Sequence, residues 1–217
     1  MTTTFMEKPI AATAAWPAWF AAEQQAALAE YEKTPLPVRK DEPWRFANLK
    51  ALDLSAFVEA RPVGSEGRLI NASIGLAETA AKLILGNNAL LHREAAALPQ
   101  GVVFETLESA AVNHTELFKK YFMAQPVELG SHKYAALHKA RLAGGAFLHV
   151  PANTNITLPI EIFHWVEGAN ASVFPHTLIV CGENSSVTVL DYFKSADKLP
   201  AFACGVNDLH LAAGAKL

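Results

Sequence analysis

The chain has 217 residues, of which 51% are hydrophobic and 18% charged, and its formal net charge at pH 7 is −3. This composition is too apolar for a disordered chain, and the balanced charge gives no field that favours nucleic acid or an anionic membrane. Two cysteines exclude a disulfide scaffold and a four-cysteine metal site. Because no signal peptide or membrane-spanning run of residues is evident, we expect a cytoplasmic protein.

Residues 1–143 mix helix and strand signals, so we interpret them as an α+β N-terminal domain. Pro17 suits the first turn of a helix that Pro35 would end, and Gly144 follows another helix that Ser131 could cap. The turn residues Gly86-Asn87-Asn88 lie between two apolar runs, which predicts a hairpin. The predicted elements are helices at about 17–33, 107–122 and 131–142, two short helices within 41–54, a hairpin over 80–91 and a strand at 102–104.

From residue 144 to 217, short apolar runs alternate with polar turns, and the pattern repeats. Phe147–Leu158 aligns with Leu178–Val189 at an offset of 31 residues, with Asn153-Thr-Asn over Asn184-Ser-Ser. A third copy begins at Asp208, with Leu209 over Ile179 and Leu217 over Val187. Strand pairs repeated in this way favour stacked β-structure, with the N-terminal domain as a cap. The alternative is a small β-sandwich with similar hairpins.

The third copy stops within its turn, so we expect the chain to be a fragment of a longer protein. In that case its last strand would expose Leu209, Leu211 and Leu217. Unpaired strand edges and exposed apolar side chains promote dimerisation, swapping or disorder.

The eight histidines do not have the spacing of a metal site. His132 and His138 are six residues apart and lie on different faces of the predicted helix. In the β region His149 aligns with Val180 and near His210, two repeats away, which is too far for side chains that share one ion. We interpret these histidines, with His164 and His176, as ordinary packing or surface residues and assign no metal ligand.

No catalytic residue is assigned either. Cys181 and Cys204 do not align in the repeat and have no basic pair nearby to lower the thiol pKa, so we interpret both as small hydrophobes. The sequence contains no Gly-x-Ser-x-Gly nucleophile elbow and no glycine-rich nucleotide loop. Cofactor-binding residues stay unassigned.

The sharpest local cluster is Pro35-Leu-Pro-Val-Arg-Lys-Asp-Glu-Pro-Trp-Arg-Phe46. On physical grounds we predict a surface helix start, in which Trp44 and Phe46 dock on the β domain and Arg45 pairs with Glu42.

This cluster resembles a signature of the SufD branch of the SufB/SufD family of iron–sulfur cluster assembly scaffolds, which reads Pro-x-Arg-x-x-Glu-x-Trp-Arg-(Tyr/Phe)-x-x-Leu. It maps onto Pro37, Arg39, Glu42, Trp44, Arg45, Phe46 and Leu49. Later blocks, among them Lys82–Asn87, Leu98–Val103, Tyr134–Ala140 and Gly145–Pro151, are similar to successive blocks of the family. One departure is His138, where the family block has Asn.

The resemblance implies an N-terminal mixed domain followed by the first rungs of a right-handed parallel β-helix, a β-solenoid. It implies a non-catalytic scaffold in a SufBCD-type complex, with a SufB-like paralogue and a SufC-like ATPase as partners. An iron–sulfur cluster and a dependence on reduced flavin belong to the full complex, with no cofactor in this chain. The cluster ligands and the ATPase-docking surface are expected beyond residue 217, so no functional residue is carried over.

A second hypothesis is a β-helix or cupin-like enzyme or module that binds carbohydrate or metal in a polar cleft near His149, His164 and His176. It predicts acidic or metal-ligating side chains converging on one face of a sheet. A third is an autonomous interaction domain unrelated to cluster chemistry.

Overall fold

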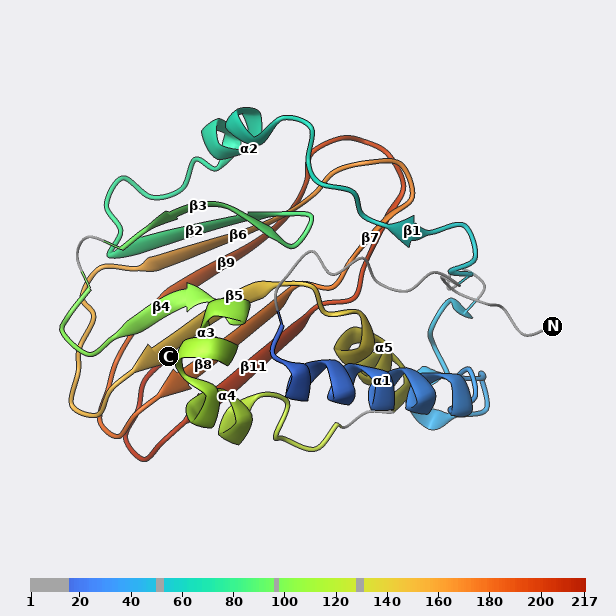
Figure 1. Cartoon of the computed structure of the whole chain (residues 1–217), viewed down its shortest axis with the longest axis horizontal. Helices are drawn as coiled ribbons and strands as arrows, with labels where there is room; N and C mark the ends of the chain where they lie inside the picture. Colours follow the sequence, from blue (N-terminus) through green and yellow to red (C-terminus); the bar gives the residue numbers. More distant parts are fainter. Residues whose placement is uncertain (1–15, 50–52, 96–97, 128–130) are drawn as a thin grey trace.

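The computed structural model describes residues 16–49, 53–95, 98–127 and 131–217. Its elements are α1 (Ala18–Lys33), a 3-10 turn η1 (Glu42–Trp44), β1 (Val58–Glu59), α2 (Glu66–Ala72), β2 (Ala81–Gly86), β3 (Ala89–Glu94), β4 (Val103–Thr106), α3 (Leu107–Asn113), α4 (Thr115–Tyr121), α5 (His132–Arg141), β5 (Gly145–Val150), β6 (Ile160–Val166), β7 (Ala171–Val173), β8 (His176–Cys181), β9 (Val189–Ser195), β10 (Ala201–Ala203) and β11 (Val206–Leu211). The fold is mixed α/β, with parallel and mixed sheets. Helices α1, α3, α4 and α5 lie together, and α2 lies apart from them beside β3 (Figure 1).

The strands form three sheets with the orders β3-β2-β6-β9, β4-β5-β8-β11 and β1-β7-β10. Only the pairs β2–β3 and β4–β5 are antiparallel; every other neighbouring pair among the described residues is parallel. β3 and β4, which run antiparallel to their neighbours, are therefore each the edge strand of a large sheet, at the end from which the parallel stacking starts.

The repeat offset predicted from the sequence is confirmed by the strand register. Phe147 pairs with Leu178, and Ile179 pairs with Leu209. The bridges Asn155–Ser186 and Ser186–Lys216 continue the same alignment through the turn. The second strand of the predicted unit differs, because residues 156–158 hold no strand and β6 starts at Ile160.

Each repeat turns at one residue in the left-handed region of φ. Asn153 has φ 58°, Asn184 has φ 53° and Gly214 has φ 69°. Asn and Gly tolerate this conformation better than other residues do, which explains why the polar turns align in the sequence. A side chain at Gly214 would also collide with Asn184, since its Cβ would lie 2.3 Å from Asn184 Oδ1.

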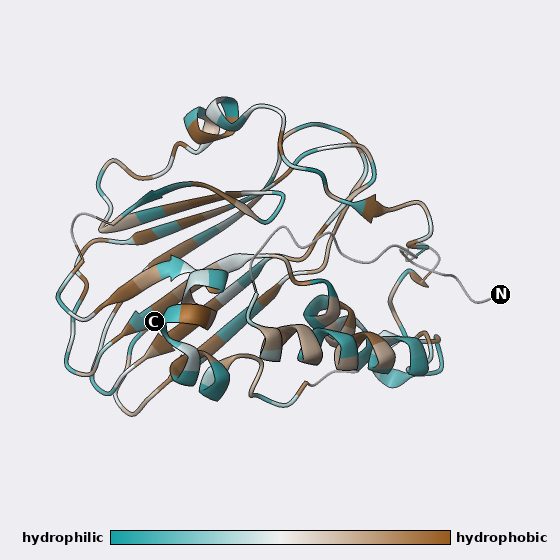
Figure 2. Cartoon of the chain, in the orientation of Figure 1, coloured by the Kyte–Doolittle hydropathy of each residue, from teal (hydrophilic) through white to brown (hydrophobic). Residues whose placement is uncertain are grey.

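Two apolar clusters hold the layers together. One lies between the two large sheets and is aliphatic, with Leu83, Leu148, Ile162 and Ile179 among its buried members. The second lies between the β4–β5–β8–β11 sheet and the helices, where aromatic rings dominate: Phe20, Phe118, Phe122 and Phe147. Apolar segments recur along the stacked strands, interrupted by polar ones (Figure 2).

The N-terminal predictions are confirmed for the helices at 17–33 and 131–142, the hairpin and the strand near 103. The predicted helix 107–122 is wrong in one respect, because it breaks at His114, where φ is −129°. The Thr115 hydroxyl there donates to the carbonyl of Ala111 at 2.8 Å, so a side chain competes with the backbone ladder. Helix α2 was not predicted.

One of the two short helices predicted within 41–54 is confirmed as the turn η1; Leu49 also has 3-10 conformation, but residues 50–52, where a second helix would continue, lie outside the described residues. The boundary between residues 143 and 144 stays a prediction. Strands from both sides of it share the two large sheets, since β2 pairs with β6 and β4 with β5.

Candidate functional site

The most strongly coupled polar cluster lies where α5 meets β8 and β11. His138 Nε2 lies 2.9 Å from His176 Nδ1, and both rings are almost completely buried. His138 Nδ1 lies 2.7 Å from the carbonyl oxygen of Cys204. His176 Nε2 faces Asp208 Oδ2 at 4.0 Å, and His210 Nε2 lies 2.8 Å from Asp208 Oδ1. Three histidines and one aspartate thus lie in a row, with an unbonded gap of 4.0 Å between His176 and Asp208 and with His210 partly exposed.

Burial determines the charges of these groups. It lowers the pKa of His138 to about 4, although the Cys204 carbonyl acts in the opposite direction. Burial also lowers the pKa of His176 well below its usual value, with further contributions from His138 and His164. The pKa of Asp208 is raised by burial, against the hydrogen bond from the Met123 amide. At neutral pH both buried imidazoles are therefore neutral.

The sequence did not predict this contact, because His138 and His176 are 38 residues apart and meet only through the docking of a helix on a sheet. His138 occupies the position where the SufD-like block has Asn, and it lies within α5, which continues to Arg141. The alignment that the sequence did predict, His149 over Val180 and Val180 under His210, is confirmed by the register.

A second cluster joins His164 of β6, Thr177 of β8 and Asp191 of β9. The Thr177 hydroxyl donates to Asp191 Oδ2 at 2.7 Å, while His164 Nε2 lies 3.1 Å from that hydroxyl and 3.2 Å from Asp191 Oδ1. The ring of Phe193 stacks on His164 at 5.0 Å. The side chains of His164 and Asp191 are only 6% and 12% exposed, so the cluster is a polar layer between the two large sheets.

A third cluster surrounds the fully buried Glu161. It accepts from the Leu76 amide at 2.8 Å and from the Tyr192 hydroxyl at 3.2 Å, and Lys82 Nζ lies 3.2 Å from its other oxygen. Gly75 passes so close that an added Cβ would lie 1.9 Å from Glu161. The carboxylate therefore fixes the segment before β2 to the sheet.

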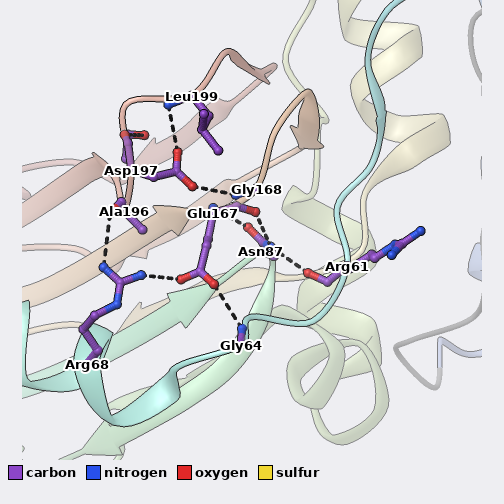
Figure 3. Close-up of polar contacts among 10 residues, drawn as sticks. Arg61, Gly64, Arg68, Asn87, Glu167, Gly168, Ala196, Asp197 and Leu199 are labelled. Atoms are coloured by element: carbon purple, nitrogen blue, oxygen red, sulfur yellow. Dashed lines mark hydrogen bonds and ion pairs between the residues drawn. The ribbon is translucent and has the colours of Figure 1, made fainter.

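Hydrogen bonds and an ion pair also hold the segment that precedes α2 (Figure 3). Glu167 accepts from the Gly64 amide at 3.1 Å and pairs with Arg68 at 2.6 Å. The Asn87 amide group donates to the carbonyls of Arg61 and Glu167, and Asp197 accepts from the amides of Gly168 and Leu199. Each carboxylate is occupied by structural partners, so this cluster fastens turns to one another.

Three hollows adjoin these groups, and one of about 220 Å³ is lined by His164, Trp165 and Phe193, among others. A small cavity of about 60 Å³ is lined by Glu59, Glu108, Arg141 and Ser172, among others. A wider groove of about 600 Å³ is lined by Met123, Gln125, Tyr134, Cys204 and Asp208, among others, beside the row of histidines. Within the described ranges no group of three or more His, Cys, Asp or Glu side chains is arranged to hold a metal ion.

Neither thiol is activated. Cys181 lies in the core between the large sheets, and burial raises its pKa. Burial raises the pKa of Cys204 to about 12. Because the thiolate is both the nucleophile and the metal ligand, the two cysteines are inert in this environment, as the sequence indicated.

The N-terminal cluster differs from the prediction. Phe46 does not dock, since its side chain is 86% exposed, and the Arg45 guanidinium lies over its ring at 4.6 Å. Trp44 contacts α5, with its ring 5.5 Å from that of Tyr134. The predicted pair of Arg45 and Glu42 is confirmed at 3.4 Å, on the surface. The 3-10 turn places Trp44 inward, and Phe46, two residues on, points to solvent.

Comparison with known proteins supports the resemblance. Residues 71–162 match the family model of the SufBD protein N-terminal region. The iron–sulfur cluster assembly protein SufD of Bacillus subtilis is 40% identical over 96 residues, which is 44% of this chain and 22% of that protein. Two SufBD family proteins of Staphylococcus aureus are 36% and 38% identical over 92 and 88 residues, 42% and 41% of this chain. These matches span 20% and 19% of the relatives. Among the helices described, none is long and apolar enough to cross a membrane.

Proposed function

We propose that the chain serves iron–sulfur cluster assembly as a non-catalytic scaffold in a SufBCD-type complex, because residues 71–162 match the model of the SufBD protein N-terminal region. The matched segment runs from the end of α2 to the first residues of β6, so it includes the antiparallel hairpin and the start of the parallel stacking. The relatives named for this role, the SufD of Bacillus subtilis among them, support the proposal.

We propose further that residues 145–217 are the first rungs of a right-handed parallel β-helix. The chain visits the three sheets in the same order twice, through β5, β6 and β7 and then through β8, β9 and β10, before β11 begins a third circuit. Each strand pairs in parallel with the strand one circuit later. The right hand is the one that parallel crossover connections almost always take.

The chemistry of the described side chains supports a scaffold role. The buried histidines are neutral, and the cysteine pKa values are raised. The iron of a cluster is held by cysteine thiolates or neutral imidazoles, whereas here the thiols stay protonated and His138 and His176 are buried away from any arriving cluster. We therefore propose that this chain holds no cofactor of its own, that the cluster is cargo built at an interface with a SufB-like paralogue, and that reduced flavin acts in the whole complex. We place that complex in the cytoplasm.

The proposal is tested by co-expression of the natural protein that contains this sequence with a SufC-like ATPase and a SufB-like paralogue. We expect a complex that survives size-exclusion chromatography, and we expect reconstitution of a cluster on the complex but not on this chain alone. A protein that binds neither partner, or a chain that assembles a cluster by itself, would contradict the proposal.

One observation favours the alternative of a carbohydrate- or metal-binding module. His164, Thr177 and Asp191 converge as that hypothesis requires, although they are closed off from solvent. Calorimetric titration of the chain with Zn²⁺ and with a panel of oligosaccharides separates the two functions. Saturable binding that His164→Gln abolishes would favour the module, and the absence of any binding heat would favour the scaffold.

A further inference from the structure

The hydrogen-bond chain at the junction of α5, β8 and β11 has a fixed direction. The carbonyl oxygen of Cys204 only accepts, so His138 Nδ1, 2.7 Å away, must carry a hydrogen. A neutral imidazole has one N–H, and His138 Nε2 is therefore an acceptor. His176 Nδ1, 2.9 Å from it, must donate. One backbone carbonyl thus sets the tautomers of two buried rings.

This direction leaves His176 Nε2 with a lone pair and no hydrogen. The His176 side chain is completely buried, and its Nε2 has no hydrogen-bond partner among the described residues. Asp208 Oδ2 lies 4.0 Å from it and is itself an acceptor, which receives the Met123 amide hydrogen. Two buried acceptors thus face each other, an arrangement that lacks one proton.

We infer that His176 Nε2 is a buried proton-acceptor site, and that uptake of one proton there converts the facing acceptors into an ion pair that ties β8 to β11 beneath α5. The first proton breaks no hydrogen bond, because His176 Nδ1 continues to donate to His138. A second proton would have to enter at His138 Nε2, where it would oppose the His176 donor and break the contact between the two rings. The junction therefore accepts one proton and is opened by the second.

The groups around His176 determine the pH at which it takes up a proton. Among the described residues, the titratable groups around His176 are His164 of β6, His138 of α5, and Asp208 and His210 of β11. The Cys204 carbonyl lies behind His138, and the Phe122 ring lies 4.8 Å from the His176 ring. Lys139 lies beyond that ring, 6.0 Å from its centroid. Burial and the neighbouring histidines lower the pKa of His176, so the proton enters only in mildly to strongly acidic solution.

Because the pKa values of His138 and His176 are lower in the folded chain than in the unfolded chain, the free energy of unfolding depends on pH. The unfolded chain takes up protons on these two histidines near pH 6.5, whereas the folded chain does so at lower pH. Their contribution to stability is therefore present above about pH 6.5 and is lost as the pH falls below it. Because His138 is a buried polar contact between α5 and the strands, we expect this loss to weaken the packing of α5.

Long-range proton–nitrogen NMR of the 217-residue chain tests the inference directly, because it reports the tautomer and pKa of each imidazole. We expect Nδ1–H tautomers for both His138 and His176 at pH 7.5, and the first proton bound as the pH falls should place a hydrogen on His176 Nε2, which faces Asp208. An Nε2–H tautomer of His176 at pH 7.5, or a first proton that leaves His176 Nε2 without a hydrogen, would overturn it. This measurement requires no variant.

A second experiment repeats the measurement on the variant Asp208→Asn. It is nearly isosteric and removes the charge that would stabilise a His176 imidazolium, so the His176 pKa should fall by about one unit or more. The exposed His132 serves as an internal control in the same spectra, and its signals should be the same in both chains. An unchanged His176 pKa in the folded Asp208→Asn variant would refute the coupling between His176 and Asp208.

Discussion

Glu108, in the first turn of α3, is a buried carboxyl whose ionisation opposes folding. Its Oε2 has no hydrogen-bond partner among the residues described, and burial raises its pKa to about 7. Between pH 4.5 and 7 the folded chain keeps the proton that the unfolded chain releases. The carboxyl therefore contributes stability below about pH 4.5, and this contribution is lost as the pH rises through 7.

We predict that Glu108→Gln, which keeps the shape and removes the charge, raises the free energy of unfolding at pH 8 by about 1–3 kcal/mol and has little effect at pH 4.5. Urea unfolding at the two pH values measures this. Glu116→Gln, at the equivalent turn of α4 on the exposed surface, is the matched control and should change stability by less than about 0.5 kcal/mol at either pH. Equal effects of the two substitutions would contradict the assignment.

Gly145, at the start of β5, is required by close packing. A Cβ there would lie 2.2 Å from the carbonyl oxygen of His176 and 2.4 Å from Leu107 Cδ1. We predict that Gly145→Ala lowers the free energy of unfolding by about 2–4 kcal/mol, because backbone and core must both shift. Gly67, in helix α2, has open space around it, so Gly67→Ala should stabilise the chain by about 0.5–1 kcal/mol. Chemical denaturation of both variants gives the comparison, and the same sign for both would contradict it.

At the scale of elements, helix α1 is closed by a side chain from α5. Lys133 is 8% exposed and donates from Nζ to the carbonyls of Tyr31 at 2.7 Å and Thr34 at 2.6 Å, with the Tyr31 ring 4.0 Å below. The ammonium group satisfies carbonyls that the end of a helix leaves unpaired and lies at the negative end of the helix dipole. Lys133 therefore couples the end of α1 to α5.

We predict that Lys133→Met, which keeps most of the stem, lowers the free energy of unfolding by about 2 kcal/mol, and that amide hydrogen exchange speeds up in the last turn of α1. Lys33→Met, on the exposed surface of the same turn, is the control and should cost less than about 0.5 kcal/mol. Unchanged exchange in the Lys133→Met variant would show that packing alone holds the helix end.

The sequence predicts an element correctly where a residue within that element determines its backbone conformation. The repeat register could be predicted because each circuit needs Asn or Gly at its left-handed turn, and these residues recur at 153, 184 and 214. Strand β6 was missed as a separate element because Ile160–Val166 is buried along almost its whole length and lacks the alternation of a half-exposed strand. The break at His114 coincides with hydrogen bonds from the Thr115 hydroxyl to the carbonyls of Ala111 and Val112, which composition does not indicate.

The candidate site was less predictable, because its members meet only through tertiary packing. His138 and His176 belong to a helix and a strand, and no spacing rule links them. The interpretation of the histidines as packing residues is correct for their burial, but it missed that His138, His176, Asp208 and His210 lie in one row. The docking of Phe46 was wrong because a Trp and a Phe two residues apart point to different sides of a 3-10 turn.

At the scale of the whole molecule, the two sides of the sheets differ in what they expose. On one side β3 is an antiparallel edge strand with exposed His92, Arg93 and Glu94, the charged kind of edge that resists pairing with another chain. On the other side β11 is a parallel edge, with Leu209 and Leu211 exposed to 40% and 49%. Leu217 is exposed to 44%, as predicted from the sequence.

We predict that this chain self-associates through the β11 edge, because unpaired backbone groups and apolar side chains lie together there. Light scattering after size-exclusion chromatography should show a mass that rises from monomer towards dimer as the concentration increases. The double substitution Leu209→Lys and Leu211→Lys should shift this rise to concentrations at least about tenfold higher, since it places charges on the apolar edge. Leu90→Lys, on the opposite edge strand β3 and similarly exposed at 47%, should leave it unchanged. A chain that stays monomeric at every concentration, or an equal response to Leu90→Lys, would contradict association through β11.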